Sequence, residues 1–248
     1  MKILITGANG FIAKNLISRL KTIDHNDLYL YDVDVKKEEL FNYTSDCSFV
    51  FHFAGVYRPK EIKGYMENNF VFAYELVNML KQHKNYAPIL LTSSIQSTLR
   101  TPYGASKMAA EDLLRDYSAE TGSEVFIYRL SNVFGKWAMP NYSNIIATIC
   151  YNIARDLPFE LKEESHEEVD FVYIEDVIDQ FINSLDGKSS CMNDNHLFDI
   201  PCHYKKQIKV VSDIIKTFND CRKSSVTPDL SDDFAKKLYD TYLTYLPE

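Results

Sequence analysis

Thr6-Gly7-Ala8-Asn9-Gly10-Phe11-Ile12-Ala13 is the most informative stretch of the sequence, because it joins two kinds of secondary structure. Residues 2–6 before it are apolar or β-branched, as in a buried strand, and residues 11–21 after it repeat apolar side chains at helical spacing. Gly7 permits a tight turn, Gly10 lets the backbone approach an anion closely, and N–H groups at the start of the helix point at that anion. The stretch therefore predicts the phosphate-binding turn of a dinucleotide site, with contacts from Gly7, Asn9, Gly10, Phe11 and Ile12.

Strands and helices continue to alternate through the first half of the chain. Further strand-like runs occupy residues 28–33, 48–53, 88–92 and 124–130, and helical periodicity occupies residues 69–83 and 104–121. Such alternation is typical of a parallel sheet with helices on both faces. We therefore predict an α/β fold built on a Rossmann doubly wound parallel sheet.

The regular alternation of strands and helices ends after about residue 135, which indicates a small C-terminal substrate-binding lobe. There we expect helices at residues 144–155, 175–184, 208–219 and 232–246, strands at 159–161 and 170–173, and a mobile loop at 186–195. The chain is expected to be one domain, residues 1–248. Residues 1–132 would form mainly the dinucleotide-binding core and residues 133–248 mainly the substrate lobe, with returning core segments near 170–184.

The composition excludes several classes of protein. With 248 residues, 46% of them hydrophobic and 25% charged, the chain is of an ordinary globular type. Its net charge of −8 argues against nucleic acid as a partner, and no run approaches the roughly 20 apolar residues that span a membrane. Its five cysteines are widely spaced and include no Cys-x-x-Cys pair, so we expect free thiols in a cytoplasmic protein and no metal site.

Asp32 lies at the end of the second expected strand, 22 residues after Gly10. A carboxylate at that place accepts hydrogen bonds from both hydroxyls of an adenosine ribose and repels a 2′-phosphate. Asp32 therefore favours NAD(H) over NADP(H). A solvated aspartate at a strand end, with Asp34 close by, is the alternative interpretation.

A serine, a tyrosine and a lysine follow in an order that suits carbonyl chemistry. Tyr103 and Lys107 are four residues apart, hence on one face of the expected helix, and Ser93-Ser94 ends the strand before it. In a chain with 17 tyrosines the Tyr-x-x-x-Lys spacing alone carries little weight. The succession of phosphate turn, acidic strand end, Ser-Ser and Tyr-x-x-x-Lys carries more.

With these motifs, the chain resembles the extended short-chain dehydrogenases/reductases, the family of nucleotide-sugar epimerases, dehydratases and reductases, over nearly its whole length. The supporting motifs are His52-Phe53-Ala54-Gly55, Asn69 at the start of a helix, Arg129-Leu130-Ser131-Asn132-Val133-Phe134-Gly135 and Asp170-Phe171-Val172-Tyr173-Ile174-Glu175-Asp176-Val177.

A subgroup of that family is similar in finer detail. The matching motifs are Ala54-Gly55-Val56-Tyr57-Arg58-Pro59, Ser93-Ser94-Ile95-Gln96, Phe134-Gly135-Lys136-Trp137 and Tyr242-Leu243-Thr244-Tyr245-Leu246-Pro247. They resemble the reductase domains of bifunctional capsule enzymes that make the UDP-N-acetyl-L-fucosamine precursor. In those enzymes a metal-binding cupin domain follows. The resemblance therefore implies either a stand-alone reductase with a cupin epimerase partner or a chain that stops before a missing cupin domain.

The resemblance implies roles for individual residues. Tyr103 would be the general acid/base, Ser94 would hydrogen-bond the substrate carbonyl, and Lys107 would bind the nicotinamide ribose and lower the pKa of the tyrosine. Besides the phosphate turn and Asp32, the implied cofactor contacts are Ala54, Gly55, Val56, Asn69, Thr92, Tyr103, Lys107 and Leu130. The implied substrate contacts are Arg58, Ser94, Ile95, Gln96, Asn132, Trp137 and Asn141. A solvated loop arginine, a structural amide and an aromatic of the lobe core are the alternatives for Arg58, Asn132 and Trp137.

The resemblance also implies an activity. We expect an NAD(P)H-dependent reductase of the C4 ketone of a UDP-4-keto-6-deoxy-N-acetylamino sugar, working in capsule or surface polysaccharide synthesis. Ile95-Gln96 stand where dehydratases have Asp-Glu, so dehydration is disfavoured. An NAD-dependent nucleotide-sugar 4-epimerase is the alternative, and a dinucleotide-binding sensor without catalysis is a lesser one. The subgroup resembles users of NADP(H), in conflict with Asp32, and a homodimer through helices 69–83 and 104–121 is implied by the resemblance only.

Overall fold

The chain forms two compact units. The structure, a computed structural model, describes residues 1–142, 144–158, 167–189 and 195–247. Unit 1 comprises Met1–Leu130 and Ile178–Ile200, and unit 2 comprises Ser131–Val177 and Pro201–Glu248. Unit 1 is therefore formed from two separate stretches of sequence.

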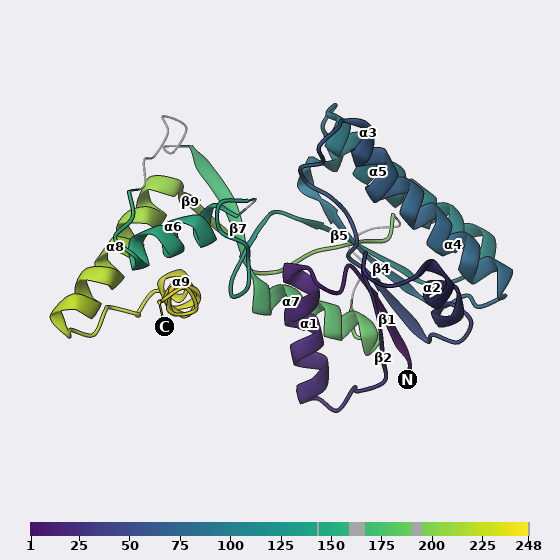
Figure 1. Cartoon of the computed structure of the whole chain (residues 1–248), viewed down its shortest axis with the longest axis horizontal. Coiled ribbons are helices and arrows are strands. Elements are labelled where there is room, and N and C mark those ends of the chain that lie inside the picture. Colours follow the sequence, from purple (N-terminus) through teal and green to yellow (C-terminus); the bar gives the residue numbers. More distant parts are fainter. Residues whose placement is uncertain (143, 159–166, 190–194, 248) are drawn as a thin grey trace. The chain divides into compact units, whose positions relative to one another are not determined.

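Unit 1 is built on a six-stranded sheet whose strands all run parallel (Figure 1). In spatial order the strands are β2 (Leu28–Tyr31), β1 (Ile3–Thr6), β3 (Phe49–His52), β4 (Ile89–Ser94), β5 (Val125–Leu130) and β8 (Leu197–Phe198). Every residue of β1, β3 and β4 is buried, in keeping with their continuous apolar sequences. The direction of connection reverses between β1 and β3, and in open α/β sheets ligands bind beyond the carboxyl ends of the strands at such a point.

Helices cover both faces of this sheet (Figure 1). One face carries α2 (Lys37–Tyr43), α4 (Phe72–Gln82) and α5 (Pro102–Thr121), and the other carries α1 (Phe11–Thr22) and the end of α7 (Ile174–Leu185). Shorter helical segments are α3 (Lys63–Met66), η1 (Glu67–Val71) and η2 (Ile95–Thr98). Successive strand residues face opposite sides, so Val50 of β3 packs in one core cluster with Leu76 and Leu114. Its neighbour Phe51 lies on the other side, 6.4 Å from Phe181 of α7 between ring centroids.

Unit 2 contains, in its described part, a small mixed sheet. The strand order is β6 (Asn132–Phe134), β7 (Glu168–Tyr173) and β9 (Tyr204–Gln207), with β6 parallel and β9 antiparallel to β7. The helices are α6 (Ile145–Ala154), α8 (Ile208–Ser224) and α9 (Asp233–Leu243). Phe134, Phe171 and Phe234 are at most 1% exposed, and their ring centroids lie 5.6–6.4 Å apart. An aromatic cluster therefore forms the core of this unit.

The expected fold class is confirmed, because unit 1 is a doubly wound parallel sheet. Four short elements, α2, β6, β8 and β9, were not predicted from the sequence. Residues 170–177, expected to return to the core, belong instead to unit 2, because β7 pairs with β6 and β9. The strand expected at residues 159–161, and residues 190–194 of the expected loop, lie outside the described residues.

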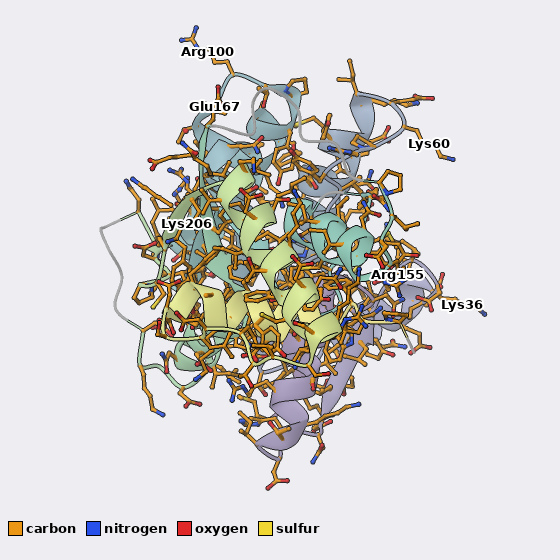
Figure 2. The ribbon with its side chains drawn as sticks, turned by 90° about the vertical axis from the view of Figure 1, so that its left-hand side faces the viewer. Lys36, Lys60, Arg100, Arg155, Glu167 and Lys206 are labelled. Atoms are coloured by element: carbon orange, nitrogen blue, oxygen red, sulfur yellow. The ribbon has the colours of Figure 1, made fainter. Side chains whose placement is uncertain are left out.

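Charged side chains cover much of the surface. Lys36, Lys60 and Arg100 of unit 1 are exposed and extend away from the ribbon (Figure 2). Glu167 of unit 2 is exposed as well. None of the described helices is long and apolar enough to cross a bilayer.

Candidate active site

The turn between β1 and α1 has the geometry of a phosphate-binding turn. Gly7 has a φ of +69°, and a Cβ there would lie 2.7 Å from the backbone nitrogen of Ala54. Only glycine suits such a position. The Gly10 N–H donates to the Gly7 carbonyl at 2.9 Å, and α1 begins at the next residue, Phe11. The N–H groups of the first turn, those of Phe11 and Ile12 included, have no partner within the helix, and the turn therefore suits a pyrophosphate.

Asp32 is bound to this turn. One oxygen of its carboxylate accepts a hydrogen bond from the Asn9 backbone N–H at 2.8 Å, and the other accepts one from the Val33 N–H at 2.8 Å. The Asn9 side-chain amide also donates to the Asp34 carboxylate at 3.4 Å. Each carboxylate oxygen has two lone pairs, so Asp32 keeps the capacity to accept bonds from ribose hydroxyls.

Gly55 and Val56 follow β3 and are held in place by Asn69. Asn69 lies in η1, a π-helical turn between α3 and α4, and such turns are frequent at functional sites. Its side chain accepts from the Val56 N–H at 2.8 Å and donates to the Val56 carbonyl at 3.2 Å and to the Ser106 hydroxyl at 2.9 Å. A Cβ at Gly55 would lie 2.7 Å from the Asn69 Oδ1 and 3.3 Å from the Lys107 Nζ. The loop therefore lies directly against the lysine.

Ser94, Tyr103 and Lys107 meet at the carboxyl end of β4. Ser94 is the last residue of the strand, and its side chain lies close enough to the Tyr103 hydroxyl to lower the pKa of that phenol. Lys107 lies one turn beyond Tyr103 on α5, and its Nζ donates to the Thr92 carbonyl at 3.1 Å. Ser94 and Lys107 are each 9% exposed, and Tyr103 is half-buried. The structure therefore brings together the three residues that the sequence analysis selected.

The local sequence specifies where α5 begins, and thereby where Tyr103 lies. The Thr101 side chain caps the helix by accepting from the Gly104 N–H at 3.0 Å, and Pro102 occupies the first turn, where it costs no hydrogen bond. A Cβ at Gly104 would collide with the carbonyl of Leu99 at 2.5 Å. These features place Tyr103 in the first turn, beside the end of β4.

Burial determines the protonation of Tyr103. It raises the pKa of Tyr103 above its ordinary value, while the nearby Ser94 side chain opposes this rise. The rings of Tyr57 and Tyr65 pack edge-on against Tyr103, with centroids at 5.1 and 5.9 Å. Desolvation of the phenolate therefore determines the direction of the shift, and the expectation that Lys107 lowers the pKa of Tyr103 stays a prediction. The phenol is neutral at pH 7 and is therefore a proton donor.

Burial also disfavours the charged form of Lys107, which for a lysine means a lower pKa. Loss of hydration lowers the pKa of Lys107 to about 8, and the charge of Glu111 opposes this. At pH 7 the ammonium form still predominates. An ammonium has three N–H donors, and the Thr92 carbonyl takes one of them.

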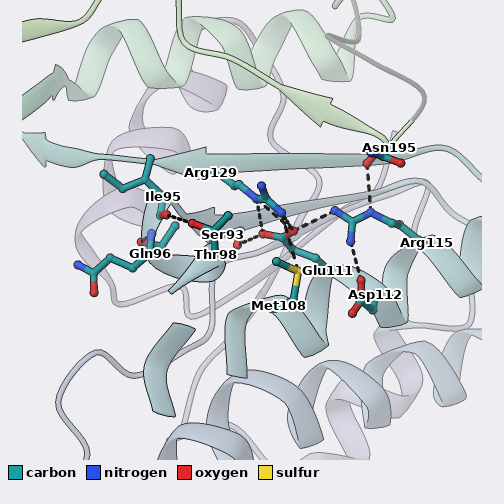
Figure 3. Close-up of polar contacts among 11 residues, drawn as sticks. Ser93, Ile95, Gln96, Thr98, Met108, Glu111, Asp112, Arg115, Arg129 and Asn195 are labelled. Atoms are coloured by element: carbon teal, nitrogen blue, oxygen red, sulfur yellow. Dashed lines mark hydrogen bonds and ion pairs between the residues drawn. The ribbon is translucent and has the colours of Figure 1, made fainter. Parts of the chain in front are cut away.

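A buried network lies behind the end of β4 (Figure 3). Glu111, which is fully buried, accepts from the Arg129 guanidinium at 2.6 and 2.9 Å, from Arg115 at 2.9 Å and from the Ser93 hydroxyl at 2.5 Å. Burial by itself would raise the pKa of Glu111. The hydrogen bonds from Arg129, Ser93 and Arg115 nevertheless hold that pKa below its ordinary value.

This network constrains the neighbour of Ser94. Ser93 pairs with Arg129 in the β4–β5 ladder, and both bind the carboxylate of Glu111. Glu111 was not predicted as a site residue from the sequence. The available signal was its position four residues after Lys107, on the same face of the helix.

A pocket of about 410 Å³ lies beside the loop that follows β3. Val56 and Arg58 line it, together with Lys60, Glu61, Lys63 and Glu67. Arg58 is exposed, and its guanidinium lies 5.8 Å from the centroid of the Tyr57 ring. Three cationic side chains against two carboxylates make the pocket suited to an anionic group.

Four other expected contacts of unit 1 lie at the ends of neighbouring strands. Thr92 and Leu130 are buried in β4 and β5, and Ile95 and Gln96 open η2 directly after Ser94. Among the described residues no cluster of three or more His, Cys, Asp or Glu side chains could hold a metal ion.

Asn132, Trp137 and Asn141 belong to unit 2. The Asn132 amide donates to the Asp170 carbonyl at 3.1 Å, which is the structural role named above as the alternative. Trp137 is 50% exposed, so its alternative role as part of the lobe core is wrong. Substrate contacts from these three residues stay a prediction.

Taken together, a glycine turn suited to a pyrophosphate, a carboxylate beside it and a buried Ser–Tyr–Lys group define a class: a nicotinamide dinucleotide-dependent enzyme of the doubly wound fold. The model of the NAD dependent epimerase/dehydratase family matches residues 3–191 of the 248. The chain therefore belongs to the NAD dependent epimerase/dehydratase family. This confirms the resemblance and the expected nicotinamide cofactor.

Two relatives match the chain over its whole length. It is 35% identical over 248 residues to a protein of Pseudomonas aeruginosa described as UDP-2-acetamido-2,6-beta-L-arabino-hexul-4-ose reductase, covering 100% of the chain and 66% of that protein. It is 36% identical, with a TM-score of 0.87, to the crystal structure of capsular polysaccharide assembling protein CapF from Staphylococcus aureus, again covering 100% and 66%. The chain thus spans just under two thirds of the length of these relatives.

A more distant structure shows the same fold. The crystal structure of UDP-glucuronic acid 4-epimerase from Bacillus cereus in complex with NAD has a TM-score of 0.80 and 17% identity, and covers 99% of this chain and 98% of that one. The expected homodimer, cupin partner and cytoplasmic location stay predictions.

Proposed function

We propose that the protein is an NAD(P)H-dependent reductase of the C4 ketone of a UDP-4-keto-6-deoxy-N-acetylamino sugar in capsule or surface polysaccharide synthesis. The observation that carries this proposal is the position of Ser94 beside a half-buried, neutral Tyr103, with Lys107 one helical turn away. The proposed substrate is supported by the 35% identity to the reductase of Pseudomonas aeruginosa, and the proposed role in capsule synthesis by the likeness to CapF.

In this reaction the carbonyl takes up a hydride at carbon and a proton at oxygen, and becomes an alcohol. When bound, NAD(P)H supplies the hydride. The Tyr103 hydroxyl gives its proton to the carbonyl oxygen, and Ser94 donates a hydrogen bond to the same oxygen and orients it. Lys107, held by the Thr92 carbonyl, binds the nicotinamide ribose with its other N–H groups and stabilises the phenolate that Tyr103 becomes.

NAD(H) is the proposed preferred cofactor. Asp32 is bound to the phosphate-binding turn through the Asn9 N–H, and Asp34 accepts a hydrogen bond from the Asn9 side-chain amide. Two carboxylates at this place repel a 2′-phosphate and accept hydrogen bonds from a ribose diol.

Tyr103→Phe removes the proton donor and leaves the ring packing in place. Turnover is expected to fall about 10²–10⁴-fold, the usual contribution of a general acid, while the variant still binds NADH. The measurement is the loss of NADH absorbance after addition of the UDP-4-keto sugar. Tyr117→Phe is the matched control, because Tyr117 lies on the same helix and donates to the Ala87 carbonyl at 3.1 Å, away from Ser94.

Undiminished turnover in Tyr103→Phe would contradict the mechanism. Interconversion of two UDP-sugars without net oxidation of NADH would instead identify the alternative, a 4-epimerase. Cofactor binding without turnover of any keto sugar would support the lesser alternative, a dinucleotide-binding sensor without catalysis.

A further inference from the structure

Tyr245, in the closing segment of the chain, is bonded to a loop more than a hundred residues earlier. Its hydroxyl donates to the Ala138 carbonyl at 2.6 Å and is also within 3.2 Å of the Gly135 carbonyl. A phenol has a single proton, so the shorter contact is the main bond. Burial raises the pKa of Tyr245, so the hydroxyl stays a donor throughout the physiological range.

The loop of residues 135–141 needs such support, because its backbone is in part unfavourable. Trp137 has a φ angle of +69°, in the left-handed region that is unfavourable for a residue with a bulky side chain, and Asn141, of a type that tolerates this region better, has a φ of +58°. The Gly135 and Ala138 carbonyls stand on either side of Trp137. The Tyr245 hydroxyl, bonded to the Ala138 carbonyl and close to that of Gly135, therefore opposes relaxation of the strained residue between them.

Tyr245 is itself held at its backbone. The Arg155 guanidinium donates to the Tyr245 carbonyl at 2.6 Å and lies 4.0 Å from the centroid of the Tyr151 ring. The phenol is 8% exposed. The hydroxyl therefore has little freedom to follow the loop if the loop moves.

The loop that Tyr245 holds presents groups suited to a nucleoside diphosphate. Trp137 offers a half-exposed indole, and the Lys136 ammonium, which pairs with the Glu175 carboxylate at 3.1 Å, lies 4.9 Å from its ring centroid. A planar base stacks on an aromatic ring, and a cation attracts the diphosphate.

We propose that Tyr245 is a positioning residue that holds the loop of residues 135–141, and thereby Trp137, in the conformation that receives the nucleotide part of the substrate. The role of the loop in nucleotide binding rests on the proposed function. The role of Tyr245 in holding the loop does not rest on the proposed function, and the two parts are tested separately.

The test uses the fluorescence of Trp137, the single tryptophan of the chain. Tyr245→Phe removes the hydroxyl and keeps the ring, so the indole is expected to become more accessible to acrylamide and to shift its emission maximum. Loss of one buried hydrogen bond is expected to weaken the binding of UDP, followed by quenching of Trp137, about fivefold to tenfold.

Tyr242→Phe is the matched control. Tyr242 is also buried, three residues earlier, and its hydroxyl donates to the Asn219 side chain at 3.0 Å instead of to the loop. Both variants lose one buried bond of a tyrosine, so a general loss of stability affects them alike. Urea unfolding and circular dichroism verify that both are folded.

Two outcomes are decisive. Acrylamide quenching and emission in Tyr245→Phe that match those of Tyr242→Phe would overturn the positioning role. If Trp137 in the unsubstituted protein does not respond to UDP, the loop does not bind the nucleotide and that part of the proposed function fails, whereas the acrylamide comparison still decides the role of Tyr245.

Discussion

Burial of the Lys107 ammonium lowers the stability of the folded protein. The pKa of Lys107 falls from 10.5 to about 8 in the folded protein, and within the described part of the chain the ammonium donates a hydrogen bond to the Thr92 carbonyl. A pKa change of this size corresponds to about 3 kcal/mol at neutral pH. The proposed reaction explains why an ammonium stands there, since the ribose and the phenolate of Tyr103 both need a cation nearby.

Lys107→Met keeps the length of the side chain and removes the charge. We expect the unliganded protein to become about 1–3 kcal/mol more stable at pH 7, because the desolvation penalty disappears while one hydrogen bond is lost. Turnover is expected to be lost at the same time. Urea unfolding at pH 7 measures the first effect, and Lys63→Met, at an exposed position, is the control.

The same variant has a pH dependence with a definite sign. The pKa of Lys107 is lower in the folded state than in the unfolded state, so the folded lysine releases its proton first as the pH rises. The desolvation penalty of the Lys107 ammonium reduces stability fully below pH 8, and it diminishes as the pH rises toward 10.5. The stability gap between Lys107→Met and the unsubstituted protein should narrow over this range, and a constant gap would refute the assignment.

At the scale of elements, α5 and β4 are joined residue by residue. Tyr103, Lys107 and Glu111 lie one helical turn apart on the same face of α5. Tyr103 lies beside the Ser94 side chain, Lys107 binds the Thr92 carbonyl and Glu111 binds the Ser93 hydroxyl. Three consecutive strand residues thus face three consecutive turns of one helix.

Glu111→Ala removes the carboxylate at the far end of this contact and leaves the Arg129 guanidinium without its main partner. Breaking a buried ion pair from one side costs about 3–5 kcal/mol, and we expect a loss of this size in urea unfolding. Asp112→Ala is the control, because Asp112 is 63% exposed and binds Arg115 from the surface at 2.7 Å. There the expected loss is below about 1 kcal/mol, and equal losses would contradict the argument.

The low pKa of Glu111 adds a test at acid pH. A carboxyl whose pKa is lower in the folded state stabilises the protein at pH values above its unfolded-state pKa, which is near 4.5. This stabilisation is lost as the pH falls through the folded-state pKa. The difference between the unsubstituted protein and Glu111→Ala should therefore shrink below pH 4.5.

At the scale of the whole sheet of unit 1, the direction of connection reverses between β1 and β3, and the residues of the candidate site lie around this point. The phosphate-binding turn follows β1, the Gly55 loop follows β3 and Ser94 ends β4, all at the carboxyl edge of adjacent parallel strands. A dinucleotide bound across this edge would contact several strands at once. Binding should therefore stabilise the folded chain as a whole.

NADH at a concentration a hundred times its Kd is expected to add about 2.7 kcal/mol, or about 5–10 °C in Tm for a chain of this size. NADPH at the same concentration should give a smaller shift, because Asp32 and Asp34 repel the 2′-phosphate. Thermal unfolding followed by circular dichroism measures both. In Asp32→Ala the difference between the two cofactors should diminish, whereas equal shifts in the unsubstituted protein would show that Asp32 does not select NADH.

Much of the site could be predicted from the sequence because the interactions concerned are local. The φ of Gly7, the Thr101 cap of α5 and the four-residue spacing of Tyr103 and Lys107 each depend on a few neighbouring residues. The alternation of apolar strands with periodic helices predicted the sheet for the same reason.

The sequence by itself thus determined the class of fold, the phosphate-binding turn and the identity of the Ser–Tyr–Lys group. Only the tertiary structure decided that β8 completes the sheet, that Glu111 meets Arg129 and that Tyr245 holds the Trp137 loop. It also decided that burial raises the pKa of Tyr103. The physical reason is the same in each case: pairing partners and desolvation come from atoms that are distant in sequence and become neighbours only when the chain has folded.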